Sequence, residues 1–346
     1  MKAAVIGLGM VAETHFRALA DLAPDVTLAG IMGRSEAKAR DYARQISPIL
    51  GETPKVYADV AEIAADDAVD FVIICTPPNA RVSLVAPLAA AGKHILMEKP
   101  IERDTAAATE IVDLCEGANV ELGIVFQHRM RESSQMLATL LAHGTLGPVA
   151  LVEIAVPWWR DQSYYDAPGR GTYARDGGGV LISQAIHTLD LALSFLGPVK
   201  RVQAMCRTTA LHEMESEDFV TAGLDFESGV VGSLTASTAS FPGGAESITF
   251  HCEKASVVLA SGQLHIHWRD GRTEVRGAAA GTGGGADPMA FTHAWHQGII
   301  ADFAKALQSD TKPAADGRSA LAVHRLIDAI VLSGRDARAV DLSEVE

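Results

Sequence analysis

The chain has 346 residues, of which 48% are hydrophobic, and a formal net charge of −14. At roughly 100–200 residues per domain this length predicts two domains, and the hydrophobic fraction excludes a disordered chain. The acidic charge would repel phosphate backbones, which argues against nucleic acid as a ligand. Four cysteines lack the spacing of a metal ribbon or a disulfide framework. No apolar run is long enough to suggest a membrane span, so we expect a cytoplasmic protein without membrane or nucleic-acid partners.

Strand-like and helix-like segments alternate over the first 125 residues. Short apolar runs occur at residues 2–6, 26–32, 69–75, 95–97 and 120–126, and helical spacing occurs at 12–23, 81–91 and 105–115, with a further helix after Ser35. This alternation predicts right-handed βαβ crossovers and a parallel sheet. We therefore expect residues 1–125 to form an α/β Rossmann domain with a doubly wound parallel sheet.

The remaining residues, 126–346, have a different pattern. Strand-like segments lie close together with turn residues between them, at 150–156, 199–207, 218–226, 229–237, 247–252, 256–259 and 263–268. Helical patterns flank them at 178–196, 290–307 and 317–333, and a glycine-alanine stretch at 277–286 is expected to form a surface loop. We expect an α+β domain for substrate binding and oligomerisation, with a mostly antiparallel open sheet. Its last helix is able to pack back on the first domain.

A glycine motif stands between the first predicted strand and the first predicted helix. The sequence GLGMVA at residues 7–12 matches the pattern GxGxxG/A in the context that dinucleotide binding requires. Gly7 permits a tight turn, and Gly9 lets the backbone approach a pyrophosphate. The backbone at Met10 and Val11 then offers N–H groups of the helix start to the phosphates.

The end of the second strand bears on the choice of cofactor. NAD sites usually place an acidic residue there to bind the ribose 2′-hydroxyl. This chain has Arg34 and Ser35 instead, and its first acid is Glu36. Arginine and serine are suited to a 2′-phosphate, although Arg34 could also be a solvated surface residue and Ser35 a simple helix cap. The pattern favours NADP over NAD.

Several motifs together resemble the Gfo/Idh/MocA oxidoreductases. Besides the glycine motif they are TPPN at 76–79, EKP at 98–100, QHR at 127–129, GTLGPV at 144–149, DGGGVLISQAIHTLD at 176–190 and ADGRSALAVHRLIDAIVLSG at 315–334. The resemblance implies an NAD(P)-dependent dehydrogenase. It also implies a homodimer or homotetramer formed through the sheet of the C-terminal domain.

In proteins of this family the TPPN and EKP motifs line the cofactor. The resemblance therefore places Thr76, Pro77 and Asn79 along the dinucleotide and Lys99 beside the nicotinamide, with Glu98 orienting the lysine. A cation at that position stabilises a developing alkoxide and can relay its proton. Family members often have histidine where this chain has Arg81, and the role of Arg81 stays open, a helix-start cation being one reading.

The family pattern also points to His187, as the general base. Members commonly have an acid where this chain has Ser183, and serine cannot act as a carboxylate base. The next residue is Gln184, and the pair is similar to the Asn-Gln pair of the UDP-sugar acid 3-dehydrogenase subgroup. Ser183, His187 and Asp190 would share one face of a helix. We expect Arg129, Ser183, Gln184 and Asp190 to line or support the site.

Aromatic and basic residues precede the GGG helix. Trp159, Arg160 and Tyr165 are candidates for substrate contact, because rings stack on sugars or bases and arginine binds carboxylate or phosphate. They could equally anchor an ordinary loop. Two histidine pairs, at 265 and 267 and at 293 and 296, have no companion ligand in register, so no metal is expected.

These observations predict hydride transfer between NADP(H), or less favourably NAD(H), and a secondary alcohol or ketone of a sugar, polyol or nucleotide sugar. Lys99 would polarise the oxygen and His187 would exchange its proton. Two alternatives remain open. One is a cis-dihydrodiol dehydrogenase or an imine or ring reductase on the same scaffold. The other is a non-catalytic dinucleotide-binding regulator, against which the presence of both Lys99 and His187 argues.

Overall fold

The computed structural model describes residues 1–281 and 291–345. The chain forms two compact units. Unit 1 comprises residues 1–102, 106–127 and 292–320, and unit 2 comprises residues 103–105, 128–291 and 321–346. Residues 282–286 of the predicted glycine-alanine loop lie outside the described residues. Among the helices that the structure describes, none is both long and apolar enough to cross a membrane.

Unit 1 contains a six-stranded sheet in the order β3-β2-β1-β4-β5-β6, and all of its pairs are parallel. Its strands are β1 (Lys2–Ile6), β2 (Thr27–Met32), β3 (Lys55–Val56), β4 (Phe71–Ile74), β5 (His94–Met97) and β6 (Leu122–Ile124). Every residue of β4 is buried, as expected for a strand covered on both faces. The predicted doubly wound Rossmann sheet is confirmed.

The helices of unit 1 follow the strands in alternation. They are α1 (Ala12–Leu22), α2 (Glu36–Leu50), α3 (Val60–Ala64), η1 (Pro78–Ala80), α4 (Val82–Ala90) and most of α5 (Thr105–Gly117). Because the strand order reverses between β1 and β4, right-handed crossovers place the helices of the two halves on opposite faces. The carboxyl ends of β1, β4 and β5 lie next to one another, which is where ligands of such sheets bind.

Residues 292–320, which come later in the chain, also belong to unit 1. The sequence pattern had predicted one domain for all of residues 126–346. Helix α9 (Ala294–Ser309) packs against α1. Its Phe303 ring meets Phe71 of β4 edge-on, with centroids 5.4 Å apart. The Phe303 side chain also fills the space above Gly123, where a Cβ would lie 2.6 Å from it. Local patterns could not show this return, because it depends on packing between distant segments.

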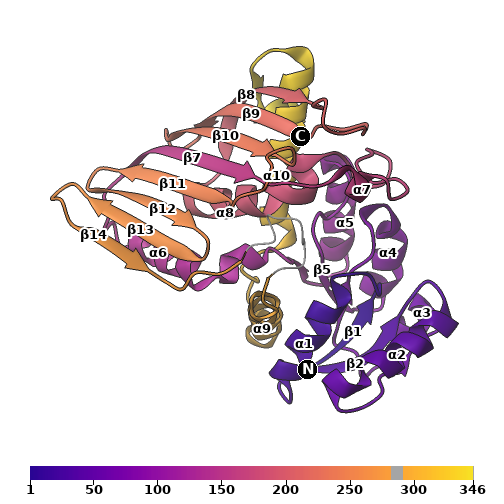
Figure 1. Cartoon of the computed structure of the whole chain (residues 1–346). Helices are drawn as coiled ribbons and strands as arrows, with labels where there is room; N and C mark the ends of the chain where they lie inside the picture. The colour runs from indigo at the N-terminus through magenta and orange to yellow at the C-terminus, as the bar shows by residue number, and fades with distance from the viewer. Residues whose placement is uncertain (282–290, 346) are drawn as a thin grey trace. The chain divides into compact units, whose positions relative to one another are not determined.

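Unit 2 contains a nine-stranded sheet in the order β14-β13-β12-β11-β7-β10-β9-β8-β15 (Figure 1). Only the pair β7 and β10 is parallel among its described pairs. The strands are β7 (Val149–Pro157), β8 (Val199–Arg207), β9 (Phe219–Phe226), β10 (Val231–Ser237), β11 (Ser247–Cys252), β12 (Ala255–Ala260), β13 (Gln263–Trp268), β14 (Thr273–Arg276) and β15 (Val340–Asp341). The expectation of a mostly antiparallel open sheet is confirmed.

One face of this sheet is covered by helices. Helices α6 (Glu132–Ala142) and α8 (Ile186–Leu196) contact each other and the sheet. Alternate strand residues are buried accordingly, for example in β12. The other helical segments are η2 (Gln127–Met130), α7 (Gln162–Tyr165), a π-helical turn (Leu181–Ala185), α10 (Gly317–Asp336) and η4 (Leu342–Val345).

Candidate active site

The glycine loop of unit 1 forms a tight cradle between β1 and α1. Gly7 has φ +97°, and a Cβ on it would lie 2.8 Å from the Cys75 carbonyl carbon and 2.9 Å from the Thr76 nitrogen. Only glycine fits there, because both the space and the backbone angle exclude a side chain. A Cβ on Gly9 would meet nothing within 4 Å, so the surface above the loop is open.

The first turn of α1 is prepared to bind an anion. Its N-cap is Val11, which supplies no side-chain hydrogen bond to the free N–H groups. Met10 is 63% exposed beside them. The buried Thr76 hydroxyl also has no hydrogen-bond partner among the described residues. These features fit a dinucleotide, whose diphosphate would lie on the backbone at residues 7–12 and whose nicotinamide would supply hydride chemistry.

The end of β2 leaves two polar side chains available. Arg34 is exposed, and no hydrogen bond or ion pair holds it within the described part of the chain. Ser35 is the N-cap of α2, yet its hydroxyl makes no capping hydrogen bond. Neither side chain is therefore committed to a structural role that would compete with a ligand.

The loop after β4 and the turn after β5 are neighbours on the sheet, since Ile74 pairs with Met97. Pro77 and Asn79 are exposed and Thr76 is half-buried. Lys99, two residues beyond β5, is also half-buried. This edge of unit 1 thus brings together the predicted cofactor residues from three strands. The predicted cofactor residues at this edge are Gly7, Gly9, Met10, Val11, Thr76, Pro77, Asn79, Glu98 and Lys99.

Arg81, whose role the sequence left open, joins these two segments. It is 2% exposed. Its Nε and Nη2 donate to the Thr76 carbonyl at 3.1 and 2.8 Å, and its Nη1 donates to the carbonyls of Glu98 and Pro100. A guanidinium that satisfies several buried carbonyls ties the loop and the turn to each other. It is a structural cross-link rather than a solvated helix-start cation.

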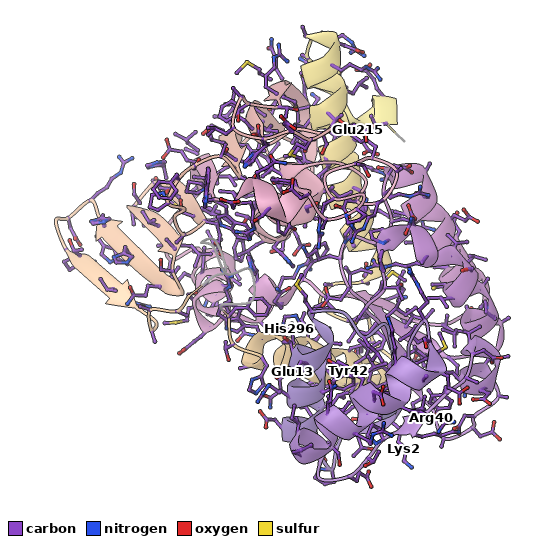
Figure 2. All side chains as sticks on the ribbon, turned by 45° about the vertical axis from the view of Figure 1, so that its right-hand side comes forward. Lys2, Glu13, Arg40, Tyr42, Glu215 and His296 are labelled. Atoms are coloured by element: carbon purple, nitrogen blue, oxygen red, sulfur yellow. The ribbon has the colours of Figure 1, made fainter. Side chains whose placement is uncertain are left out.

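Glu98 lies beneath this turn in a buried cluster with two histidines. Its Oε1 is 2.9 Å from His15 Nε2, on α1, and 3.6 Å from His296 Nε2, on α9. His296 is labelled in Figure 2. Sequence spacing indicated no companion ligand for His296, because its neighbours His15 and Glu98 are far away in the chain. One side-chain nitrogen or oxygen atom of each of the three residues lies within 4.8 Å of the other two, a spacing at which they could bind a metal ion.

The charges of this cluster follow from its geometry. Burial raises the pKa of Glu98, but hydrogen bonds and charge from His15 and His296 outweigh burial and hold it well below its usual range. Burial opposes the charged form of His15, yet charge and hydrogen bonding from Cys75 and then Glu98 raise its pKa to about 10. Burial lowers the pKa of His296. At neutral pH the cluster is therefore a Glu98 carboxylate, a His15 imidazolium and a neutral His296.

In unit 2, the GGG segment packs directly on Glu217. A Cβ on Gly179 would lie 1.8 Å from the Glu217 carbonyl oxygen, so no larger residue fits. The Glu217 carboxylate accepts hydrogen bonds from the backbone of Gly179 and Leu181, at 3.2 and 3.1 Å. The following turn is π-helical, a feature that is frequent at functional sites. It interrupts the regular α-helical spacing expected between Ser183 and His187.

His187 is 6% exposed and lies in a second buried polar group. Its ring stacks on His128, with centroids 4.8 Å and planes 25° apart. Arg131 donates to His128 Nε2 at 2.6 Å and to Glu246 at 2.7 Å. Because arginine only donates, His128 Nε2 must accept and its proton must be on Nδ1. His128 belongs to the QHR motif at residues 127–129, but nothing in that motif indicates its contact with His187.

The other residues expected around His187 differ in what they can do. Arg129 forms two hydrogen bonds with the fully buried Asp190, at 2.8 and 2.6 Å. Burial raises the pKa of Asp190, and the Arg129 guanidinium opposes this shift. This pair anchors α8. Ser183 is half-buried, and the buried Gln184 side-chain oxygen has no partner among the described residues, which leaves it available to a ligand.

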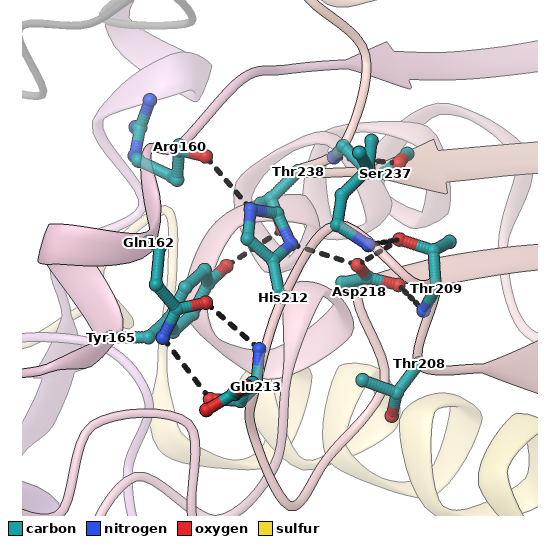
Figure 3. A network of polar contacts seen from close by, with 12 residues as sticks. Arg160, Gln162, Tyr165, Thr208, Thr209, His212, Glu213, Asp218, Ser237 and Thr238 are labelled. Carbon is teal, nitrogen blue, oxygen red and sulfur yellow. Dashed lines mark hydrogen bonds and ion pairs between the residues drawn. The ribbon is translucent and has the colours of Figure 1, made fainter.

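The aromatic segment after β7 is partly structural. Tyr165 is 7% exposed and shares a hydrogen bond of 2.7 Å with Thr238. Figure 3 shows this contact within a network in which the His212 ring lies between the Arg160 carbonyl, at 2.9 Å, and the Asp218 carboxylate, at 2.8 Å. Arg160 and Tyr165 are thus built into the fold of unit 2.

Trp159 has a different environment. It is half-buried and meets Phe241 edge-on, with ring centroids 5.4 Å apart. Phe241 is 77% exposed. The two rings form an aromatic surface that a sugar or base could stack on. Phe241 was missed because a single phenylalanine beside Pro242 and glycines carries no recognisable pattern.

Comparison with known proteins agrees with this geometry. Residues 1–126 match the family model for an oxidoreductase with an NAD-binding Rossmann fold, and residues 134–258 match the GFO/IDH/MocA C-terminal domain. D-apiose dehydrogenase of Paraburkholderia graminis is 27% identical over 355 aligned residues, covering 100% of this chain and 90% of that protein. Inositol 2-dehydrogenase of Rhizobium meliloti is 26% identical, covering 98% of each.

A solved structure is similar over nearly the whole chain. The WlbA dehydrogenase of Chromobacterium violaceum, in complex with NADH and UDP-GlcNAcA, has a TM-score of 0.82 and 28% identity, covering 99% of this chain and 95% of that one. With both domain models matched and the cofactor cradle in place, the chain belongs to the Gfo/Idh/MocA family of nicotinamide-dependent oxidoreductases.

Proposed function

We propose that the protein is a dehydrogenase that interconverts a secondary alcohol and a ketone on a sugar, polyol or nucleotide sugar. The observation that carries this proposal is the position of Lys99. It follows β5 at the same sheet edge as the glycine loop of β1, with only β4 between those strands. A lysine at that edge is suited to act on a substrate oxygen beside the nicotinamide.

The proposed roles divide the work between two side chains. The nicotinamide, when bound, accepts or returns the hydride. The Lys99 ammonium stabilises the negative charge that develops on the alcohol oxygen. His187 accepts the hydroxyl proton, because a neutral imidazole nitrogen can act as a general base. Arg129 and Asp190 support the helix of His187, and Gln184 is the available polar contact for substrate.

Within this class we propose a nucleotide sugar as the first substrate to test. WlbA, crystallised with UDP-GlcNAcA, is the basis from the comparisons. The Trp159–Phe241 surface supports the idea, because aromatic rings stack on both sugars and nucleobases. Ser183-Gln184 in place of an acidic residue agrees with a mechanism that uses histidine as the base.

We also propose that NADP(H) is preferred over NAD(H). The exposed Arg34 guanidinium and the uncommitted Ser35 hydroxyl are suited to a 2′-phosphate. No acidic residue stands at the end of β2 to bind a 2′-hydroxyl.

For assembly we propose a homodimer or homotetramer formed through the open sheet face of unit 2. Four exposed apolar residues, Leu151, Met205, Val231 and Val275, lie on this face by strand register. Leu151 is directly opposite Val231 on the parallel pair β7 and β10. An exposed apolar group of this kind on an open sheet is typical of a subunit interface.

A substrate panel tests the function. The purified protein is mixed with NADP⁺ or NAD⁺ and with UDP-GlcNAcA, D-apiose, myo-inositol, a cis-dihydrodiol or, in the reducing direction, a cyclic imine. Reduced nicotinamide is followed by absorbance. We expect turnover of a sugar-type alcohol that Lys99→Met and His187→Ala each reduce strongly. Turnover of the dihydrodiol or imine alone would favour the other enzymatic reading, and unchanged turnover in both variants would contradict the assigned roles.

A further inference from the structure

We propose that Arg81 and His15 are positioning residues for Lys99, which fix the turn at residues 98–100 from two sides. The inference rests on the proposed role of Lys99 and adds the means by which its amine is held. Neither residue needs to contact substrate or cofactor for this role.

Arg81 holds the backbone of the turn. Its Nη1 donates to the carbonyls of Glu98 and Pro100 and, at 3.3 Å, to that of Ile101. Its other nitrogens donate to the Thr76 carbonyl. The carbonyls on both sides of Lys99 are therefore attached to the loop after β4. A lysine in place of Arg81 has a single nitrogen and cannot reach both segments in this way.

His15 holds the side chain of the same turn. The Glu98 carboxylate, one residue before Lys99, accepts from His15 Nε2 at 2.9 Å, with His296 Nε2 3.6 Å from the same oxygen. His15 is fully buried and His296 is 1% exposed. Helices α1 and α9 thus fix the carboxylate, and the ionised state of Glu98 leaves it without a proton to donate.

The contact between His15 and Glu98 has the geometry of a hydrogen-bonded charge pair. Ligand atoms around a tetrahedral zinc at its usual bond lengths are about 3.3 Å apart. The 2.9 Å between Nε2 of His15 and Oε1 of Glu98 is instead a normal charge-assisted hydrogen bond. The cluster therefore holds a proton between its two charged members.

Fixing the turn matters because a lysine side chain is long and flexible. Its amine reaches a defined position only if the backbone that bears it is fixed. Displacement of a reacting group by about 1 Å can cost on the order of 100-fold in rate. Loss of the Arg81 or His15 contacts is therefore expected to reduce the rate of the chemical step more than it weakens cofactor binding.

The experiment compares Arg81→Lys and His15→Gln with wild type and with Arg44→Lys. Arg44 pairs with Asp41 on α2 and is 69% exposed, so it is a matched arginine change away from the turn. Three quantities are measured: turnover of the panel substrate, NADH affinity by fluorescence, and labelling of each lysine amine by acetic anhydride, read by mass spectrometry. The labelling of Lys99 relative to Lys38, an exposed lysine on α2, needs no substrate.

We expect kcat to fall about 10- to 100-fold in both variants, with NADH affinity changed less than about threefold. The Lys99 labelling rate should change relative to Lys38, and Arg44→Lys should match wild type. Unchanged kcat and unchanged Lys99 labelling in folded variants would overturn the proposal, as would stoichiometric zinc in the purified protein. If Arg81→Lys does not fold, His15→Gln, which retains a hydrogen-bond donor, decides the question. If no panel substrate is turned over, the proposed function fails while the labelling still tests the positioning.

Discussion

The rings of His128 and His187 stack with their centroids 4.8 Å apart, and Arg131 fixes the tautomer of His128 by donating to its Nε2. The Arg131 guanidinium is itself paired with the buried Glu246 carboxylate. The ring of His187 therefore lies against a neighbour whose orientation and proton position are set by a buried ion pair. This arrangement gives the proposed general base a defined orientation.

Replacement of His187 by alanine should reduce kcat by about 100- to 10,000-fold, the usual contribution of a general acid or base. NADH affinity should stay within about threefold of wild type, because the proposed cofactor residues lie in unit 1. Steady-state rates and fluorescence titration measure the two quantities. A loss of cofactor affinity without a loss of kcat would contradict the role.

Replacement of Lys99 by methionine removes the charge while keeping most of the side-chain length. We expect a loss of kcat of the same order, about 100-fold or more, because the developing alkoxide loses its electrostatic partner. In the Lys99→Met/His187→Ala double variant the losses should be clearly less than additive, since the two residues would act on one step. Fully additive losses would argue for separate roles.

Replacement of Arg34 by alanine tests the cofactor preference. It should weaken NADPH binding by about 10- to 100-fold, as expected for loss of a charge-assisted hydrogen bond, and leave NADH binding nearly unchanged. Fluorescence titration of both cofactors measures this, with Arg44→Ala as the control. Equal effects on the binding of the two cofactors would show that Arg34 does not bind the 2′-phosphate.

The buried pair of His15 and Glu98 predicts a pH-dependent contribution to stability. The pKa of His15 is raised from 6.5 to about 10, so its contribution is complete below about pH 6.5 and is lost as the pH rises towards 10. The pKa of Glu98 is lowered, so its contribution is present above its ordinary value of 4.5 and is lost in acid. His15→Gln should therefore lower the free energy of unfolding by about 2 kcal/mol near pH 6 and by clearly less near pH 9.

Denaturant unfolding at the two pH values measures this difference. His143→Gln is the control, because His143 is exposed at the C-cap of α6 and outside the cluster. An equal loss of stability at both pH values would mean that the His15 charge does not contribute.

Charges on the open sheet face should separate the subunits. Leu151→Glu combined with Val231→Glu places two like charges at paired positions on the neighbouring strands β7 and β10. An interface on this face would have to bury both charges. Light scattering coupled to size-exclusion chromatography should show a dimer or tetramer for wild type and a smaller species for the variant. A wild-type monomer would contradict the proposed assembly.

The sequence alone was sufficient for the Rossmann sheet, the mostly antiparallel second sheet and the cofactor motifs. These depend on local patterns: alternating segments, a glycine turn after a strand, and helix caps. The contacts of Arg81, His15 and His296 could not be anticipated in the same way. Each joins segments far apart in the chain. Neither residue spacing nor residue type indicates which buried carbonyl or carboxylate a basic side chain will contact.

The π-helical turn at Leu181–Ala185 shows a second limit. Counting by α-helical steps placed Ser183 and His187 on one face, but a wider turn changes the direction in which the earlier residues point. Backbone geometry of this kind depends on tertiary packing, and the segment just before this turn packs closely on Glu217 at Gly179. A sequence pattern built on regular helix periods does not contain it.

The return of residues 292–320 to unit 1 makes the two halves of the gene product interdependent. A fragment that stops at residue 127 would lack Phe303, and the Phe71 ring and the glycine that it covers, Gly123, would lose this cover. Neither half can therefore be obtained as an intact piece by one cut. Chimaeras between relatives would therefore require junctions near residues 127, 291 and 320 rather than a single junction.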